Sequence, residues 1–457
     1  MRARCVLANG LWLASAAREA MAFRRNLHRV AEVQEAILLR TLRRNAIPIR
    51  TLAEYREQVP IRTWDGLPAP LDRRAEARPT LEPVLRWERT SGSSGAVKEI
   101  PYTRSLLREL NAAIAPWIVS LFAAEPRAFA GEAYWSISPG AESDEEVLGP
   151  VQRRLVRAVQ AVPSSVRLAS DIEEFRRETL RHLTRCRTLS LISVWHPSFL
   201  ELLVGDIDTE KTWPNLRVVS CWADANAAAP AAALARRFPH AKIQPKGLLS
   251  TEGFVTIPFE GASVLAYRSH FYEFRDGADV RLAHELEAGR RYQVVLTTGG
   301  GLYRYDTEDV VEVTGYRERA PVLRFIGRAQ HVSDHFGEKL NEIFVRERLQ
   351  TALRDIAHSF AMLACDRDAY VLYIDSDAPL NGALGALELS LRESHHYDYA
   401  RRLGQLGPLR AMHVHNGPSI YLAVKARRQT LGDIKIPALD REQGWTERFE
   451  RGSGERL

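Results

Sequence analysis

The sequence has 457 residues, too many for one core of ordinary size, so we expect two or three folded domains. Hydrophobic residues make up 45% of the chain and charged residues 26%, which is typical of a globular protein. The net charge of +6 is small against 63 basic and 57 acidic residues, so the sequence gives no case for a nucleic-acid partner.

The four cysteines, Cys5, Cys186, Cys221 and Cys365, lie far apart, without the spacing of a metal or redox site. We therefore expect reduced thiols and a cytoplasmic location. No apolar run approaches the roughly 20 residues that cross a bilayer, so we expect no membrane partner. The apolar stretch 6–17 continues into a charged segment without a cleavage-site pattern, which favours a packed helix over a signal peptide.

Apolar periodicity predicts two helices in the first part of the chain, over residues 30–44 and 105–121. We expect the second helix to be kinked or broken at Pro116, because proline removes a backbone donor. A proline-rich connection over 60–83 and a short strand over 84–87 are expected between the two helices.

Short apolar strands then alternate with helical stretches, which is typical of a layered α/β domain with a mixed sheet. The predicted strands cover residues 189–194, 216–220, 264–267, 292–298, 302–313 and 322–326, and an Ala-rich helix covers 223–235.

The pattern changes beyond Arg328, where a compact α+β unit is predicted. Its expected elements are a helix over 338–356, strands over 360–364 and 370–374, and a helix over 382–392. We place the boundary near residues 328–334, with a large domain over 1–330 and a small domain over 331–457.

The segment Thr90–Lys98 has the composition of a phosphate-binding loop. Gly92 and Gly95 allow a tight backbone approach, the neighbouring serines offer hydroxyl donors, and Lys98 supplies a positive charge. A strand, a small-residue loop and a helix in succession allow backbone N–H groups to converge on an anion. Alone, the pattern fits a flexible surface loop equally well.

Two acidic segments follow. Thr251 and Glu252 lie between Gly247 and Gly253, where a carboxylate could sit beside a bound Mg²⁺, which takes few protein carboxylates. In the segment 302–311 an acidic residue between two strands could accept hydrogen bonds from ribose hydroxyls. Alone, the first segment is better explained by a solvated Glu in a turn. The second segment alone is better explained by a structural salt-bridge group with nearby arginines.

In this order, the three segments resemble the acyl- and aryl-adenylate-forming ligases, and more closely the Gretchen Hagen type acyl acid–amido synthetases in their bacterial form. Further matching segments are 100–103, 213–216, 221–224, 321–328, 337–342, 397–406 and 431–437. The resemblance implies a large N-terminal adenylate-forming domain with mixed sheets flanked by helices, and a small mobile α+β C-terminal domain.

The same resemblance implies the site residues. The ATP-binding set is Ser91, Gly92, Ser93, Ser94, Gly95, Lys98, Thr251, Glu252, Asp309, Phe325 and Arg328. Within it the Ser/Gly loop holds the phosphates, Glu252 contacts Mg²⁺ and Asp309 binds the ribose. Lys339 and Lys435 of the small domain are the implied catalytic cations. Glu308 departs from the family pattern, which has glycine before the ribose aspartate.

The implied reaction adenylates a small carboxylic acid with ATP, releases pyrophosphate and transfers the acyl group to an amine, usually that of an amino acid. Trp195, His196 and Trp222 are candidate walls of the acyl pocket. The alternatives are core packing for the two tryptophans and a satisfied polar role for His196. Two further functions stay open: an acyl-CoA or carrier-protein ligase, and a nucleotide-binding protein whose activity Glu308 reduces.

Overall fold

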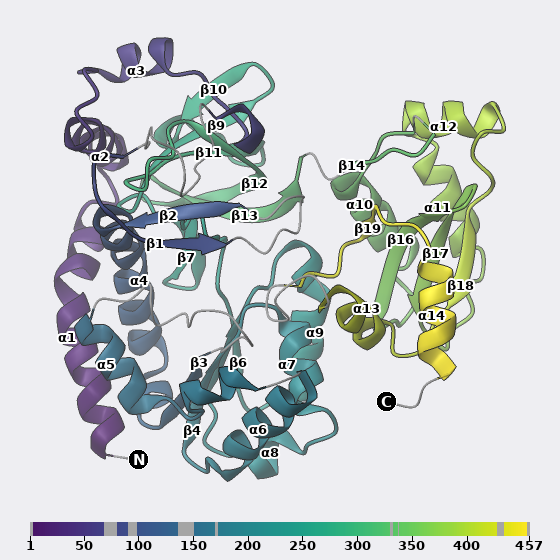
Figure 1. Ribbon diagram of the computed structural model, residues 1–457, viewed down its shortest axis with the longest axis horizontal. Coiled ribbons are helices and arrows are strands. Elements are labelled where there is room, and N and C mark those ends of the chain that lie inside the picture. The colour runs from purple at the N-terminus through teal and green to yellow at the C-terminus, as the bar shows by residue number, and fades with distance from the viewer. Residues whose placement is uncertain are drawn as a thin grey trace. The chain divides into compact units, whose positions relative to one another are not determined.

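Figure 1 shows a computed structural model of the chain, which describes residues 3–67, 80–89, 98–135, 150–169, 172–329, 332–336, 338–426 and 434–454. The chain divides into two compact units. The large unit comprises Met1–Asp224 and Ala231–Ile326, and the small unit comprises Ala225–Pro230 and Gly327–Leu457. The roles expected for residues 1–330 and 331–457 stay predictions.

One sheet of the large unit is parallel, with the strand order β3-β4-β5-β6. Its strands are β3 (Glu132–Trp135), β4 (Leu189–Ser193), β5 (Val218–Cys221) and β6 (Lys242–Pro245). Every residue of β4 and β5 is buried, as expected for parallel strands with both faces covered. The N-terminal segment and the connections near these strands contain the helices α1 (Ala3–Arg25), α5 (Pro150–Val159), α6 (Ile172–Arg185), α7 (Pro197–Val204), α8 (Thr209–Thr212) and α9 (Ala228–Arg237).

The other main sheet of the large unit, called the antiparallel sheet below, has seven strands in the order β10-β9-β11-β12-β13-β8-β7. Their bounds are β7 (Thr256–Phe259), β8 (Ala262–Leu265), β9 (Phe271–Asp276), β10 (Asp279–Leu282), β11 (Arg291–Thr297), β12 (Tyr305–Arg317) and β13 (Ala320–Arg328). A separate antiparallel pair is formed by β1 (Val84–Arg89) and β2 (Glu99–Thr103). The expected α/β class with sheets flanked by helices is confirmed, and the parallel strands of the large unit lie in a sheet of their own.

Helix α4 (Arg104–Ala124) contributes to the cores of both sheets. Leu106 and Leu110 join the core of the antiparallel sheet, while Ile118 and Leu121 join the core beneath the parallel sheet and α1. Figure 1 shows α1 running along α4. The helix continues through Pro116, so the break considered for that position does not occur.

By length and composition alone, α4 is the one helix of the described ranges that could cross a membrane. The expectation that no apolar run approaches that length therefore needs correction at α4. A core helix passes the same test, and 50% of the apolar window of α4 is buried inside the protein.

Helix α2 (Val30–Arg44) packs against the antiparallel sheet and has the bounds that the sequence predicts. Helix α3 (Leu52–Gln58) follows it and begins at a capping box, in which the Thr51 hydroxyl and the Glu54 carboxylate each accept a backbone N–H.

The small unit contains a mixed sheet in the order β18-β17-β16-β19, in which β16 and β17 are antiparallel and the outer strands are parallel to their neighbours. The strands of this sheet are β16 (Phe360–Asp366), β17 (Ala369–Asp375), β18 (Arg410–His413) and β19 (Leu439–Asp440). A separate antiparallel pair is formed by β14 (Val332–Ser333) and β15 (Leu340–Asn341). The helices of the small unit are α10 (Glu342–Ala352), α11 (Ala383–Leu391), α12 (His395–Arg402), α13 (Gly417–Ala426) and α14 (Trp445–Gly454).

Candidate nucleotide and acyl site

Lys98 and Glu252 come together in the large unit. The Nζ of Lys98 lies 3.9 Å from the Oε1 of Glu252, and the two side chains are only 13% and 7% exposed. The same ammonium donates a hydrogen bond of 2.9 Å to the hydroxyl of Tyr305. It also lies 5.6 Å from the ring centroids of both Trp64 and Tyr305. A cation that follows the predicted phosphate loop therefore faces the predicted metal carboxylate.

The turn that carries Thr251 and Glu252 is fixed by its own hydrogen bonds. The backbone N–H and hydroxyl of Ser250 both donate to the carbonyl of Gly253, at 3.1 and 3.0 Å. Tyr102 on β2 donates to the carbonyl of Thr251 at 3.1 Å. Glu252 is buried, so the alternative of a solvated glutamate is wrong.

Strand β12 bulges at the predicted ribose aspartate. Gln293 of β11 pairs with Val310, whereas Val295 pairs with Asp306, so residues 307–309 stand opposite a single residue. A bulge of this kind redirects side chains out of the regular ladder. Asp309, the predicted ribose ligand, is the last residue of the bulge and is buried.

The backbone of Glu308 has a φ of +65°, a conformation in which glycine is favoured. Its N–H donates to Asp306 Oδ1 at 2.9 Å, which helps to hold this conformation. The glycine that the family has at this position is therefore explained by the backbone, and Glu308 adopts the same conformation.

The arginines near this strand belong mainly to structural ion pairs. Arg304 donates to Glu273 at 2.8 Å inside the large unit, and Arg324 pairs with Glu312 at 3.1 Å. For these two arginines the salt-bridge alternative is correct. Burial raises the pKa of Asp306, and Arg275, 3.1 Å away, opposes that shift.

The remaining predicted nucleotide residues are placed as follows. Phe325 is half-buried on β13, and its N–H donates to the carboxylate of Asp224 at 3.3 Å. Burial raises the pKa of Asp224. Arg328 ends β13 and belongs to the small unit.

The two predicted catalytic lysines, Lys339 and Lys435, also lie in the small unit. Lys339 is exposed with a φ of +45°, and Lys435 is half-buried. The loop residues Ser91, Gly92, Ser93, Ser94 and Gly95 lie outside the described residues. The roles of all these residues stay predictions.

The predicted acyl-pocket residues gather at the carboxyl edge of the parallel sheet. Trp195 and His196 follow β4, and Trp222 follows β5. The ring centroids of Trp195 and Trp222 lie 5.4 Å apart, and the ring centroids of His196 and Trp222 lie 6.5 Å apart. The carboxyl edge is where open α/β sheets bind ligands. The Nδ1 of His196 accepts the N–H of Ser198 and caps α7, so His196 also has a structural role.

Lys246 is a residue at this edge that the sequence did not single out. It follows β6, is 3% exposed and donates to Ser193 Oγ at 2.6 Å. Its Nζ lies 4.7 Å from the ring centroid of Trp195 and 5.3 Å from that of Trp117. Lysine is rarely buried, so only its place directly after a strand could have indicated a position in the site.

Comparison with known proteins identifies the family. The model of the GH3 family N-terminal domain matches residues 20–205, and the model of the GH3 family central domain matches residues 263–328. The chain belongs to the GH3 family. This is the Gretchen Hagen type that the sequence resembles.

Curated GH3 relatives match short segments of the chain. The probable indole-3-acetic acid-amido synthetase GH3.6 of Oryza sativa subsp. japonica is 42% identical over 66 residues, which are 14% of this chain and 13% of the relative. The jasmonoyl–L-amino acid synthetase GH3.5 of the same plant is 31% identical over 139 residues, 27% of this chain and 24% of the relative. The chain thus matches a quarter or less of the length of either relative.

Solved structures match the GH3 chain over most of its length. The GH3.15 acyl acid amido synthetase has a TM-score of 0.74 at 16% identity and covers 94% of this chain and 95% of its own. A 2-hydroxyisobutyryl-CoA ligase in complex with an acyl-AMP has a TM-score of 0.53 at 13% identity, over 96% of this chain and 90% of its own. At these identities the likeness shows that the chains share a fold.

Proposed function

We propose that this chain is an ATP-dependent ligase that adenylates a carboxylic acid and transfers the acyl group to an amino acid. The observation that carries the proposal is the largely buried contact between Lys98 and Glu252. Lys98 also contacts Tyr305 on β12, the strand that contains Asp309. Relatives named as amido synthetases support the amine as acceptor. The bacterial form of the family and a cytoplasmic location belong to the same proposal, supported by the Ala- and Arg-rich sequence and by four buried free thiols.

The chemistry requires positioning and charge neutralisation more than proton transfer. The carboxylate of the acid attacks the α-phosphorus of ATP, an acyl-AMP forms and pyrophosphate leaves. The amine then attacks the acyl carbon, so that an amide and AMP form and the amine loses a proton. Lys98 is suited to bind phosphate oxygens, and the predicted Lys339 and Lys435 would add movable positive charge.

The described residues fit a Mg²⁺ ion that accompanies ATP. No group of three or more His, Cys, Asp or Glu side chains gathers as a metal site in the described ranges. Mg²⁺ bound with a nucleotide needs only one or two carboxylates, because phosphates and water supply its other oxygens. Glu252 would supply that carboxylate, and bound Mg²⁺ would stabilise the negative charge of the phosphates.

Pyrophosphate release from the full chain tests the proposal. ATP is supplied with a panel of aromatic and aliphatic acids, with and without amino acids or coenzyme A. We expect release that depends on the acid and an amide product that requires an amino acid. Replacing Lys98 or Glu252 by Ala should lower the rate by roughly 10²–10³, the scale of losing one charge-stabilising group.

A matched control is Lys211→Ala, because Lys211 is 87% exposed and pairs only locally with Asp208. It should leave the rate unchanged. Release that does not depend on the acid would contradict a ligase. A thioester product that requires coenzyme A would favour the acyl-CoA ligase instead, and nucleotide binding without release would favour a nucleotide-binding protein.

A further inference from the structure

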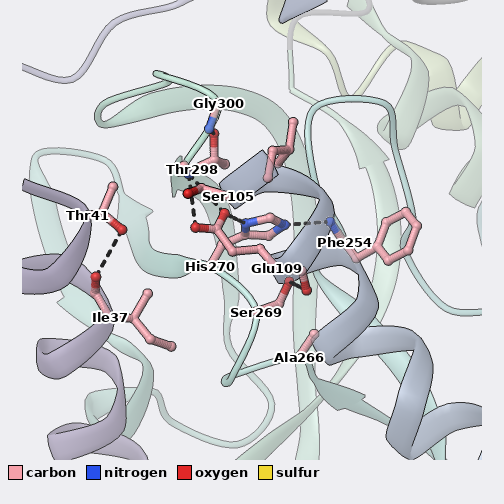
Figure 2. Close-up of polar contacts among 12 residues, drawn as sticks. Ile37, Thr41, Ser105, Glu109, Phe254, Ala266, Ser269, His270, Thr298 and Gly300 are labelled. Atoms are coloured by element: carbon pink, nitrogen blue, oxygen red, sulfur yellow. Dashed lines mark hydrogen bonds and ion pairs between the residues drawn. The ribbon is translucent and has the colours of Figure 1, made fainter. Parts of the chain in front are cut away.

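A buried acid–histidine pair lies behind the Glu252 turn. Glu109 of α4 is 7% exposed, and His270, the residue before β9, is fully buried. The Nδ1 of His270 lies 2.9 Å from Glu109 Oε2. Figure 2 shows the two side chains pointing toward each other between α4 and the antiparallel sheet. The chemistry proposed above uses neither residue.

Each member of the pair holds a backbone segment. The N–H of Gly299, in the turn between β11 and β12, donates to both oxygens of Glu109, at 3.1 and 2.9 Å. The N–H of Phe254 donates to His270 Nε2 at 3.2 Å, a contact drawn in Figure 2. Phe254 is two residues beyond Glu252, so the histidine is tied to the turn that presents this carboxylate.

These bonds define the tautomer of His270. A backbone N–H can only donate, so Nε2 must offer its lone pair to Phe254. The proton then resides on Nδ1, where it points at the carboxylate of Glu109. A proton on Nε2 would place two N–H groups against each other and would release Phe254.

Glycines on both segments allow the close approach. A Cβ at Gly253 would lie 2.9 Å from His270 Nε2, and a Cβ at Gly299 would lie 2.6 Å from Glu109 Oε1. Any larger residue in either place would push its segment away from the pair. The arrangement therefore depends on residues at four distant positions in the chain.

We propose that Glu109 and His270 form a positioning pair that holds the Glu252 turn in the geometry required for nucleotide binding. The pair acts through the N–H of Phe254 and touches no substrate. Its effect on catalysis rests on the proposed function, whereas its effect on the turn does not. A carboxylate that acts at a phosphate or metal must be held within about 0.5 Å, which explains the need for such support.

The first test is spectroscopic and needs no activity. Histidine ¹⁵N shifts of the labelled full chain at pH 7 should show one buried imidazole with protonated Nδ1 and bare Nε2, and this signal should vanish in His270→Gln. A doubly protonated ring or a proton on Nε2 would overturn the proposal.

The second test separates positioning from general stability. His270→Phe keeps the ring shape but removes both hydrogen bonds, whereas His270→Gln keeps a donor and an acceptor. In the Phe variant we expect hydrogen exchange of the peptide containing Phe254 to rise at least tenfold. We also expect its KM for ATP to rise at least tenfold while the KM for the acid stays within twofold. The Gln variant should restore part of both effects.

The control is His240→Phe, because the His240 ring is likewise hydrogen-bonded to the backbone, here to the carbonyl of Trp213 at 3.1 Å. It should leave the KM for ATP and the exchange at Phe254 unchanged. Unchanged exchange in a folded His270→Phe would overturn the proposal, as would equal rises in both KM values. If the parent protein shows no ligase activity, the proposed function fails, and the nitrogen shifts and exchange rates still decide the role of the pair.

Discussion

Glu308 is a residue with a Cβ whose backbone nevertheless adopts a left-handed conformation. Its φ of +65° costs a residue with a Cβ roughly 1–2 kcal/mol. Glycine avoids that cost but loses more conformational entropy on folding, roughly 0.5–1 kcal/mol. The backbone strain of Glu308 and the extra entropy loss of a glycine partly cancel, and the backbone strain is the larger of the two.

We therefore expect Glu308→Gly to raise the free energy of unfolding by up to about 1 kcal/mol, measured by urea denaturation. Glu308→Val should lower it by more than ~1 kcal/mol, because a β-branched residue tolerates positive φ least. The matched control is Val310→Gly on the same strand, where the strand conformation makes glycine unfavourable and stability should fall. A loss of stability in Glu308→Gly would contradict this account of the bulge.

At this scale the sequence indicated chemistry better than conformation. Glu252 and Lys98 could be chosen because their neighbours match a family pattern, and the structure brings them together. Glu109 and His270 could not be chosen, because they are 161 residues apart and nothing local links them. Lys246 was missed because a lysine is typical of a protein surface and rarely buried.

Helix α3 is tied to the antiparallel sheet by a buried ion pair. Glu273 of β9, which is 1% exposed, accepts hydrogen bonds from both Arg304 and Arg56, each at 2.8 Å. Arg304 also donates to the backbone carbonyls of Arg56 and Val59, at 2.9 and 2.8 Å. The end of α3 and the start of β12 therefore share one carboxylate.

Glu273→Gln should lower the free energy of unfolding by about 3–5 kcal/mol, because it leaves buried guanidinium charge without its counter-ion. Glu312→Gln serves as the control. Glu312 pairs with Arg324, whose side chain is 55% exposed, and such surface pairs contribute at most about 1 kcal/mol. Urea denaturation measures both, and equal losses in the two variants would contradict a special role for Glu273.

Elements were predictable where their pattern is local. The apolar stripe of residues 30–44 gave α2 with its observed bounds. The helix expected from residue 338 begins instead at Glu342, because β14 and β15 pair first and Asn341 caps the helix by accepting the N–H of Ile343. Pairing between β8 and β13 joins segments far apart in sequence, so periodicity could not assign the strands to separate sheets.

The molecule as a whole contains thiols that resist ionisation. Burial raises the pKa of Cys221 and of Cys365 to about 12, against about 8.5 for a free thiol. Between these values the unfolded chain has lost protons that the folded chain keeps. The free energy of unfolding therefore falls as pH rises through that window, by about 1.4 kcal/mol per pH unit for each thiol.

The free energy of unfolding, measured by urea denaturation from pH 8 to pH 11, should fall steadily above about pH 9. Replacing Cys221 by Ala should make the fall shallower by about 1.4 kcal/mol per pH unit, because alanine has no proton to lose. The Leu168→Ala variant is a suitable control, since Leu168 is 79% exposed and does not ionise. An unchanged slope in Cys221→Ala would contradict the raised pKa.

Helix α4 carries both Glu109, which contacts His270, and Trp117, whose ring lies beside Lys246 at the edge of the parallel sheet. Trp117 lies eight positions after Glu109, which corresponds to about 12 Å at 1.5 Å per residue. One inserted residue would turn the two ends against each other by about 100°, so that one site would lose its contact whichever end kept its place. The helix thus fixes the distance and the rotation between the two side chains. We expect insertions and deletions among related sequences to lie in the loops outside α4.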